Sequence, residues 1–121
     1  MIKNILLVGT GSFAGGILRY LISILIKYQS GFPWATFIVN IAGCLIIGLL
    51  WGWSSRSSSL SENVMLLLSV GFCGGFTTFS TFSKESVALL QAGNYLTLAV
   101  YIASSIAIGI LFAALGYIIT K

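Results

Sequence analysis

The amino-acid sequence predicts an all-α membrane protein with four transmembrane helices, the third of which is broken in mid-membrane. Of the 121 residues, 58% are hydrophobic and only 7% are charged. An ordinary soluble domain has about a quarter charged residues, so this composition fits folding in water poorly. The charges also divide the chain into apolar stretches close to the roughly 20 residues that a helix needs to cross a bilayer.

These apolar stretches set the expected bounds of the spans. The first covers about residues 5–26, between two lysines. The second covers 32–53, and its early proline suits the first turn of a helix. The third covers 62–90, after a serine-rich polar loop, and the fourth covers 95–120, after a Gln-Ala-Gly-Asn turn. The connections are short, so we expect residues 1–121 to form a single four-helix membrane domain.

The third span contains an unusual segment rich in glycine and threonine. Residues 71–78 read Gly-Phe-Cys-Gly-Gly-Phe-Thr-Thr, and both glycine and β-branched threonine are weak helix formers. Non-helical backbone is tolerated at membrane depth only where protein buries it or where it lines a wet cavity. We therefore expect a broken helix at 74–78, of the kind that often holds ions. The alternative is a continuous helix with a glycine-rich packing face.

The composition also argues against several classes of function. The chain has no histidine, which excludes imidazole acid–base catalysis and histidine metal sites. Its two acids, Glu62 and Glu85, fall near opposite ends of the third span, where Glu85 is expected to pair with a cation. Six scattered cations do not form the basic patch that nucleic-acid binding requires. We expect no enzyme, no nucleic-acid partner and no mid-membrane proton relay, which favours passive permeation.

The positive charges give almost no signal for orientation in the membrane. With four spans, three cations fall on each side: Lys3, Arg56 and Lys121 against Arg19, Lys27 and Lys84. The positive-inside rule therefore has little to act on. Either a partner protein fixes the orientation, or the chain inserts both ways and pairs as an antiparallel homodimer. The short chain has little interior of its own for a pore, which also favours a dimer.

Polar and aromatic residues inside the spans are the candidate functional residues. Asn40 lies well inside the second span, where it either lines a wet path or forms an interhelical hydrogen bond. Phe79 and Phe82 are three residues apart and share one helix face, where they serve either as core or as electropositive ring edges that favour an anion. Arg19 either faces an anion vestibule or snorkels to the interface. Hydroxyl groups that would extend a polar path belong to Ser80, Thr81, Tyr101 and Ser105.

The chain resembles the Fluc (CrcB-type) fluoride channels over essentially its whole length, and three motifs carry the resemblance. They are GSFAGGILRY at 11–20, TFIVNIAG at 36–43 and GFCGGFTTFSTFS at 71–83. The third motif is the most specific, because its order of glycine, threonine and phenylalanine is unusual among small four-helix proteins. The resemblance implies a fluoride-selective passive channel that exports cytoplasmic fluoride from a bacterium through its inner membrane. It also implies an antiparallel, dual-topology homodimer with two pores.

The resemblance further implies roles for single residues. A structural sodium ion on the dimer axis would be bound by backbone carbonyls of Gly74 and Thr77, and Arg19 would be a vestibule residue. Gly109 stands where some relatives carry a further hydroxyl group, so the far end of the polar track differs here. The fluoride pore and its polar track would use Asn40, Phe79, Phe82, Ser80, Thr81, Tyr101 and Ser105.

Two other classes of membrane protein have a similar size. A small dual-topology, proton-coupled multidrug exporter usually needs a mid-membrane glutamate, which this chain does not offer. A holin-like or assembly protein would explain the glycines that pack helices, but not Asn40 together with the polar run TTFSTFS at 77–83.

Overall fold

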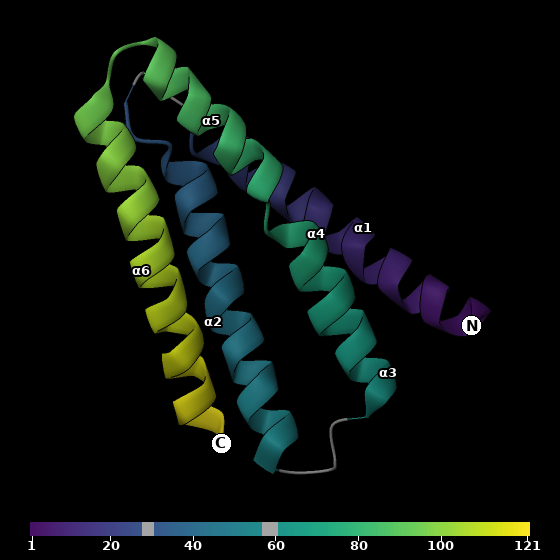
Figure 1. Ribbon diagram of the computed structural model, residues 1–121. Coiled ribbons are helices and arrows are strands. Elements are labelled where there is room, and N and C mark those ends of the chain that lie inside the picture. Colours follow the sequence, from purple (N-terminus) through teal and green to yellow (C-terminus); the bar gives the residue numbers. More distant parts are fainter. Residues whose placement is uncertain (28–30, 57–60) are drawn as a thin grey trace.

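The computed structural model describes residues 1–27, 31–56 and 61–121, which form helices joined by short connections (Figure 1). Four helical stretches are long and apolar enough to cross a membrane: α1 (Ile2–Leu25), α2 (Trp34–Arg56), the stretch Glu62–Gln91 and α6 (Tyr95–Thr120). The expected class, an all-helical protein with four membrane-spanning helices, is therefore confirmed. Both ends of the chain lie toward the same end of the molecule as the end of α2 (Figure 1).

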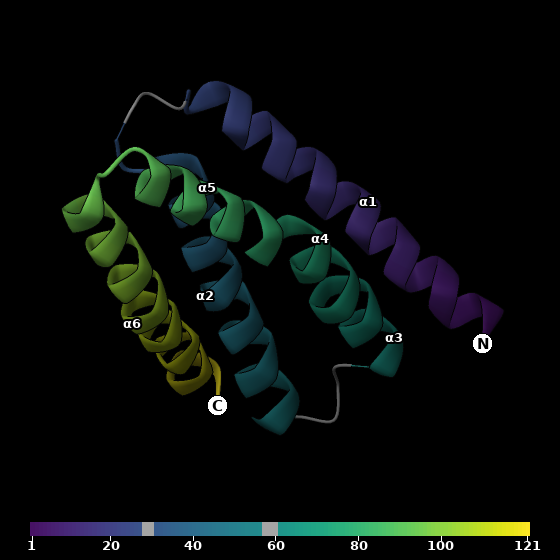
Figure 2. The ribbon, with the colours of Figure 1, turned by 45° about the horizontal axis from the view of Figure 1, so that its top comes forward.

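The third span is built from several helical pieces. It begins with α3 (Glu62–Met65), continues as the π-helical segment η1 (Leu66–Cys73) and ends its first half with α4 (Gly74–Phe76). After a break, α5 (Phe79–Gln91) runs on in a different direction (Figure 2). The π-helical segment was not expected from the sequence; such segments often occur at functional sites.

The break is narrower than the sequence predicts. Only Thr77 (φ −85°, ψ 158°) and Thr78 (φ −149°, ψ 121°) are extended, whereas residues 74–76 are helical. Gly75 serves close packing and does not interrupt the helix, because a β-carbon there would overlap the backbone oxygen of Ser12 in α1. The alternative of a glycine-rich packing face is thus correct for Gly75, and the broken helix is correct for the two threonines.

The helices pack in two groups. In the first group α2 lies along α6, and in the second α1 lies against η1 and α4 (Figure 2). Glycines allow both contacts, since a β-carbon on Gly48 would overlap the Ala113 carbonyl and one on Gly11 would overlap the Leu67 carbonyl. Small residues at such contacts let helix backbones approach closely in lipid. α2 lies between α6 and the third span (Figure 2), which places a groove between the two groups.

Candidate functional site

A groove of about 590 Å³ lies between α2, the broken third span and α6. It is open along one side and mostly apolar, with polar groups near the break. Six of the residues predicted from the sequence line it, and they come from three different spans: Asn40, Gly74, Thr77, Phe79, Phe82 and Ser105. The structure therefore brings these candidates together, although up to 65 residues of chain separate them.

Asn40 connects α2 to the break in the third span. Its Nδ2 donates a hydrogen bond of 3.1 Å to the Thr78 carbonyl, and its Oδ1 accepts one of 2.9 Å from the Thr78 N–H. The side-chain amide thus pairs with both polar groups of one residue, as a neighbouring peptide would. The sequence left open whether Asn40 forms an interhelical hydrogen bond or lines a wet path. In the structure Asn40 bonds to Thr78 and also lines the groove, so the two interpretations are compatible.

The threonines give α5 a well-formed beginning beside the groove. Thr78 is the N-cap, and its Oγ1 accepts a hydrogen bond of 3.1 Å from the Thr81 N–H. Threonine is a preferred N-cap residue for this reason. The first N–H groups of a helix carry a partial positive charge, so the start of α5 at Phe79 presents a favourable potential for an anion in the groove.

The same hydrogen bonds free two carbonyl groups on the other side of the break. In an uninterrupted helix the Thr78 N–H would bond to the Gly74 carbonyl, but it bonds to Asn40. The Thr81 N–H would bond to the Thr77 carbonyl, but it bonds to the Thr78 side chain. These two carbonyls, which the resemblance to fluoride channels assigns to a cation, have therefore lost their helical donors. Carbonyl oxygens at the ends of half-helices are suitable ligands for Na⁺, so these two groups fit that ion.

The two phenylalanines lie on the same face of α5, as their spacing predicts. Their ring centroids are 5.8 Å apart with an angle of 37° between the planes. Phe79 is 78% exposed in the isolated chain, whereas Phe82 lies against the Tyr101 ring at a centroid distance of 4.9 Å. Phe79 is therefore the ring that remains available to another molecule.

The predicted hydroxyl groups do not all line the groove. Ser105 lines the groove, and its buried Oγ has no hydrogen-bond partner within the part of the chain that the structure describes. Ser80 is exposed and shares a hydrogen bond of 3.3 Å with Thr78 Oγ1. Thr81 lines a second cavity, and Tyr101 is fully buried against Phe82.

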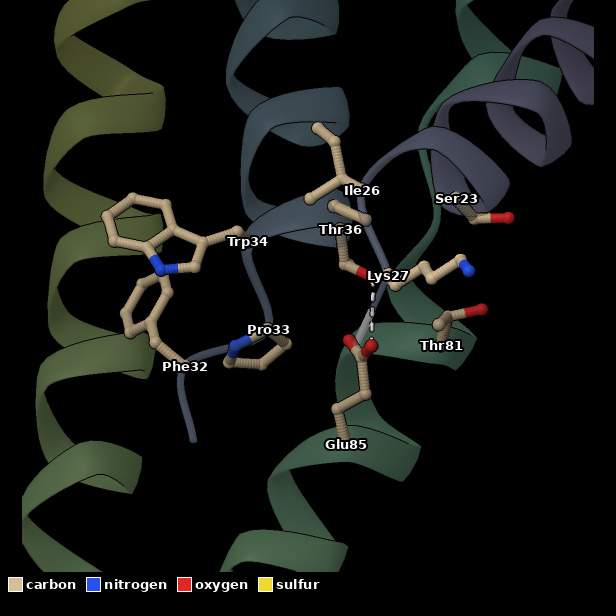
Figure 3. Close-up of a pocket in the computed structure, with 10 residues that line it drawn as sticks. Ser23, Ile26, Lys27, Phe32, Pro33, Trp34, Thr36, Thr81 and Glu85 are labelled. Atoms are coloured by element: carbon tan, nitrogen blue, oxygen red, sulfur yellow. Dashed lines mark hydrogen bonds between the residues drawn. The ribbon is translucent and has the colours of Figure 1, made fainter. Parts of the chain in front are cut away.

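This second cavity, of about 360 Å³, lies where α1 ends and α2 begins, beside α5 (Figure 3). Glu85 accepts a hydrogen bond of 3.1 Å from Thr36 Oγ1 and one of 2.9 Å from the Tyr101 hydroxyl. Glu85 does not pair with the expected cation among the described residues: two hydroxyl groups hold its carboxylate, and Lys27 extends away from it (Figure 3). Thr36 is a site residue that the sequence reasoning missed. Its signal was the position one helical turn before Asn40 on the same face.

Arg19 points toward the third span. Its Nε donates a hydrogen bond of 3.2 Å to the Gly75 carbonyl, so a backbone acceptor in α4 satisfies this nitrogen. A role of Arg19 in an anion vestibule and snorkelling to the membrane interface both stay predictions.

Comparison with known proteins identifies close relatives of the chain. A "Fluoride-specific ion channel FluC" of Azobacteroides pseudotrichonymphae is 49% identical, with 100% of this chain and 98% of the relative covered. A protein with the same description from Phocaeicola vulgatus is 47% identical over 94% of this chain and 95% of the relative. "Fluoride-specific ion channel FluC 2" of Rhodococcus jostii is 47% identical over 98% and 99%.

The family comparison covers nearly the same length. Residues 6–117 match the family described as "CrcB-like protein, Camphor Resistance (CrcB)". This match includes most of α1 and α6, the whole of α2 and of the third span with its break, and every residue of the groove. With relatives of 47–49% identity along nearly the whole chain, the conclusion is direct: the chain belongs to the CrcB-like family.

Proposed function

We propose that this protein is a fluoride-selective, passive ion channel that exports cytoplasmic fluoride. The observation that carries the proposal is the groove, where Asn40, the two phenylalanines and the unbonded Ser105 hydroxyl meet beside the start of α5. The names of the relatives, which are fluoride-specific ion channels at 47–49% identity, support the same ion for this chain.

The lining of the groove suits a small anion. Fluoride is strongly hydrated, so a pore must replace its water with donors that do not trap it. Asn40 uses one Nδ2 hydrogen on the Thr78 carbonyl and keeps a second one for another acceptor. The Ser105 hydroxyl and the electropositive ring edges of Phe79 and Phe82 add further weak donors. In this proposal Ser80, Thr81 and Tyr101 extend the polar path beyond the groove, and Arg19 lies near its vestibule.

Permeation is proposed to be passive because the described lining of the groove holds no carboxylate. A proton-coupled drug exporter needs an ionisable relay in mid-membrane. Glu85 lines the other cavity, near the end of α1, and its carboxylate is held by two hydroxyl groups. Fluoride that enters a cell as neutral hydrogen fluoride and dissociates there leaves down its own gradient, so a channel suffices.

We propose that two chains pair in antiparallel orientation in the inner membrane of a bacterium. The balance of three cations on each side supports insertion in both orientations. The groove is open along one side, and Phe79 at its edge is 78% exposed, so a second copy would complete it. Each chain contributes one groove, and a dimer would therefore contain two pores.

A structural Na⁺ at the dimer axis belongs to the same proposal. The freed carbonyls of Gly74 and Thr77 would hold it, and a second antiparallel copy would supply a matching pair. The ion would supply positive charge between the carbonyl ends of two half-helices. The threonine N-cap and the Asn40 amide keep those carbonyls free.

Replacement of the groove phenylalanines tests the proposal. We expect Phe79→Leu and Phe82→Leu to cut fluoride efflux from liposomes strongly, because leucine keeps the apolar volume but has no electropositive ring edge. Phe13→Leu is the matched control, since Phe13 is 71% exposed on α1 and lies outside the groove lining. Size-exclusion chromatography shows whether each variant still elutes as the wild type does. Unchanged efflux from both groove variants would remove the rings from the mechanism.

A further inference from the structure

We propose that Arg19 is a positioning residue for the carbonyl end of the broken helix. It holds the Gly75 carbonyl and thereby fixes the direction of the freed carbonyls on either side, those of Gly74 and Thr77. This inference rests on the proposed function, and in particular on the sodium site.

The packing of α1 on the third span places Arg19 beside the end of α4. Gly11, Gly15 and Arg19 follow each other at intervals of four residues, so they share one face of α1. A β-carbon on Gly11 would overlap the Leu67 carbonyl, and one on Gly15 would overlap the Phe72 carbonyl. The backbone of α1 therefore touches that of η1 along the two glycines. One turn further on, the same face meets the end of α4, and the side chain there is that of Arg19.

At the end of α4, the Gly75 and Cys73 carbonyls have hydrogen-bond donors that hold them in place. In an uninterrupted helix the Gly75 carbonyl would accept from the Phe79 N–H, but Phe79 lies beyond the break. The Arg19 Nε–H replaces that donor at 3.2 Å. The Cys73 carbonyl is held by the Thr77 N–H at 2.9 Å and by Thr77 Oγ1 at 2.8 Å. The Gly74 carbonyl thus lies between two fixed peptides, and its own helical donor bonds to Asn40.

The interaction of Arg19 with the end of α4 is also electrostatic. The helical run from Glu62 to Phe76 carries partial negative charge on its last carbonyls. The positively charged guanidinium of Arg19 lies against this end. The charge and the hydrogen bond of Arg19 therefore act at the same place. We assign the positioning of the carbonyls to the hydrogen bond.

Two substitutions separate the bond from the charge. In Arg19→Gln the amide Nε2 follows Cδ, as Nε does in arginine, so a neutral donor stays in place. In Arg19→Met the side chain has a similar length but no donor. The measurement is the melting temperature of the purified protein in detergent, with Na⁺ replaced stepwise by N-methyl-D-glucamine. We expect the glutamine variant to keep the wild-type Na⁺ dependence, and the methionine variant to need about tenfold more Na⁺ for the same rise in melting temperature.

Ser12→Ala is the matched control, because Ser12 is also on α1 and its Oγ donates to the Gly71 carbonyl at 3.2 Å. Its loss lowers the melting temperature by the same amount at all Na⁺ concentrations. The proposal is overturned if the methionine variant keeps the wild-type Na⁺ dependence of melting, if the glutamine variant changes it as much as the methionine variant does, or if wild-type melting does not depend on Na⁺. Should the methionine variant fail to fold, the comparison of the glutamine variant with the wild type tests the proposal: a glutamine variant with a weakened Na⁺ dependence of melting overturns it. Absent fluoride efflux with intact Na⁺-dependent melting would overturn the proposed function and leave the role of Arg19 standing.

Discussion

The pair of hydrogen bonds between Asn40 and Thr78 makes a sharp prediction about stability. We consider Asn40→Leu, which keeps nearly the same shape but has neither a donor nor an acceptor. In the native protein the amide satisfies both the N–H and the carbonyl of Thr78, at 2.9 and 3.1 Å. Leucine would leave the Thr78 N–H without its partner next to a mostly apolar groove.

The expected loss follows from two contributions. Side-chain hydrogen bonds in membrane proteins average about 0.6 kcal/mol each, so the two bonds together account for about 1 kcal/mol. A partly buried N–H without a partner costs about 1–3 kcal/mol more. The second contribution is the larger, and the free energy of unfolding should fall by about 2–4 kcal/mol. Fluoride efflux should be lost as well, because the break would no longer be held in place.

Reversible unfolding in mixed detergent, followed by tryptophan fluorescence, measures this loss. Asn40→Asp is an informative comparison, because its carboxylate still accepts from the Thr78 N–H but has no donor for the Thr78 carbonyl. We expect the aspartate variant to be more stable than the leucine variant and yet to conduct no fluoride, since its negative charge repels the anion. A leucine variant with wild-type stability would refute the reasoning, because the paired hydrogen bonds would then contribute nothing.

Two further predictions concern packing and the second cavity. Gly48→Ala should lower the free energy of unfolding by about 1–3 kcal/mol, because its methyl group would overlap the Ala113 carbonyl. Gly16→Ala has no atom within 4 Å of the new methyl group and should be neutral or gain about 0.5–1 kcal/mol, so equal thermal melts for the two variants would contradict the packing argument. Thr36→Val and Glu85→Gln should each cost about 1.5–3 kcal/mol, and the double variant should cost less than the total of both, with a coupling of about 0.5–3 kcal/mol in a double-mutant cycle. Additive losses would show that Thr36 and Glu85 do not act as a pair.

Much of the fold could be predicted from the sequence, because the bilayer dictates the length and apolar character of each span. The place of the break could not be predicted to the residue. Glycine marks either an interruption or a close contact, and at Gly75 it marks a contact with α1. The sequence does not say which neighbour lies there. Thr77 and Thr78 interrupt the helix because Asn40, on another span, takes over the hydrogen bonds of Thr78.

The candidate site shows a similar division. Asn40, Phe79, Phe82 and Ser105 stand out as polar or clustered aromatic residues in apolar spans, and all of them line the groove. The bonds of Glu85 were missed for a physical reason. Thr36 lies 49 residues away and Tyr101 lies 16 residues away, so the packing of α2 and α6 on α5 decides whether they meet.

The contact between Arg19 and the third span is easier to predict from the sequence than the bonds of Glu85. The GxxxG pair in the first span extends by one more turn to Arg19. The face that packs on the third span therefore includes this residue.

Fluoride efflux from liposomes that contain the purified protein tests the central claim most directly. The liposomes are loaded with fluoride or with chloride, and release is followed with ion-selective electrodes in the absence of a proton gradient. The account predicts fast release of fluoride, little release of chloride, and no effect of an imposed proton gradient beyond that of its voltage. No fluoride release from well-folded protein, or release that requires a proton gradient, would contradict it.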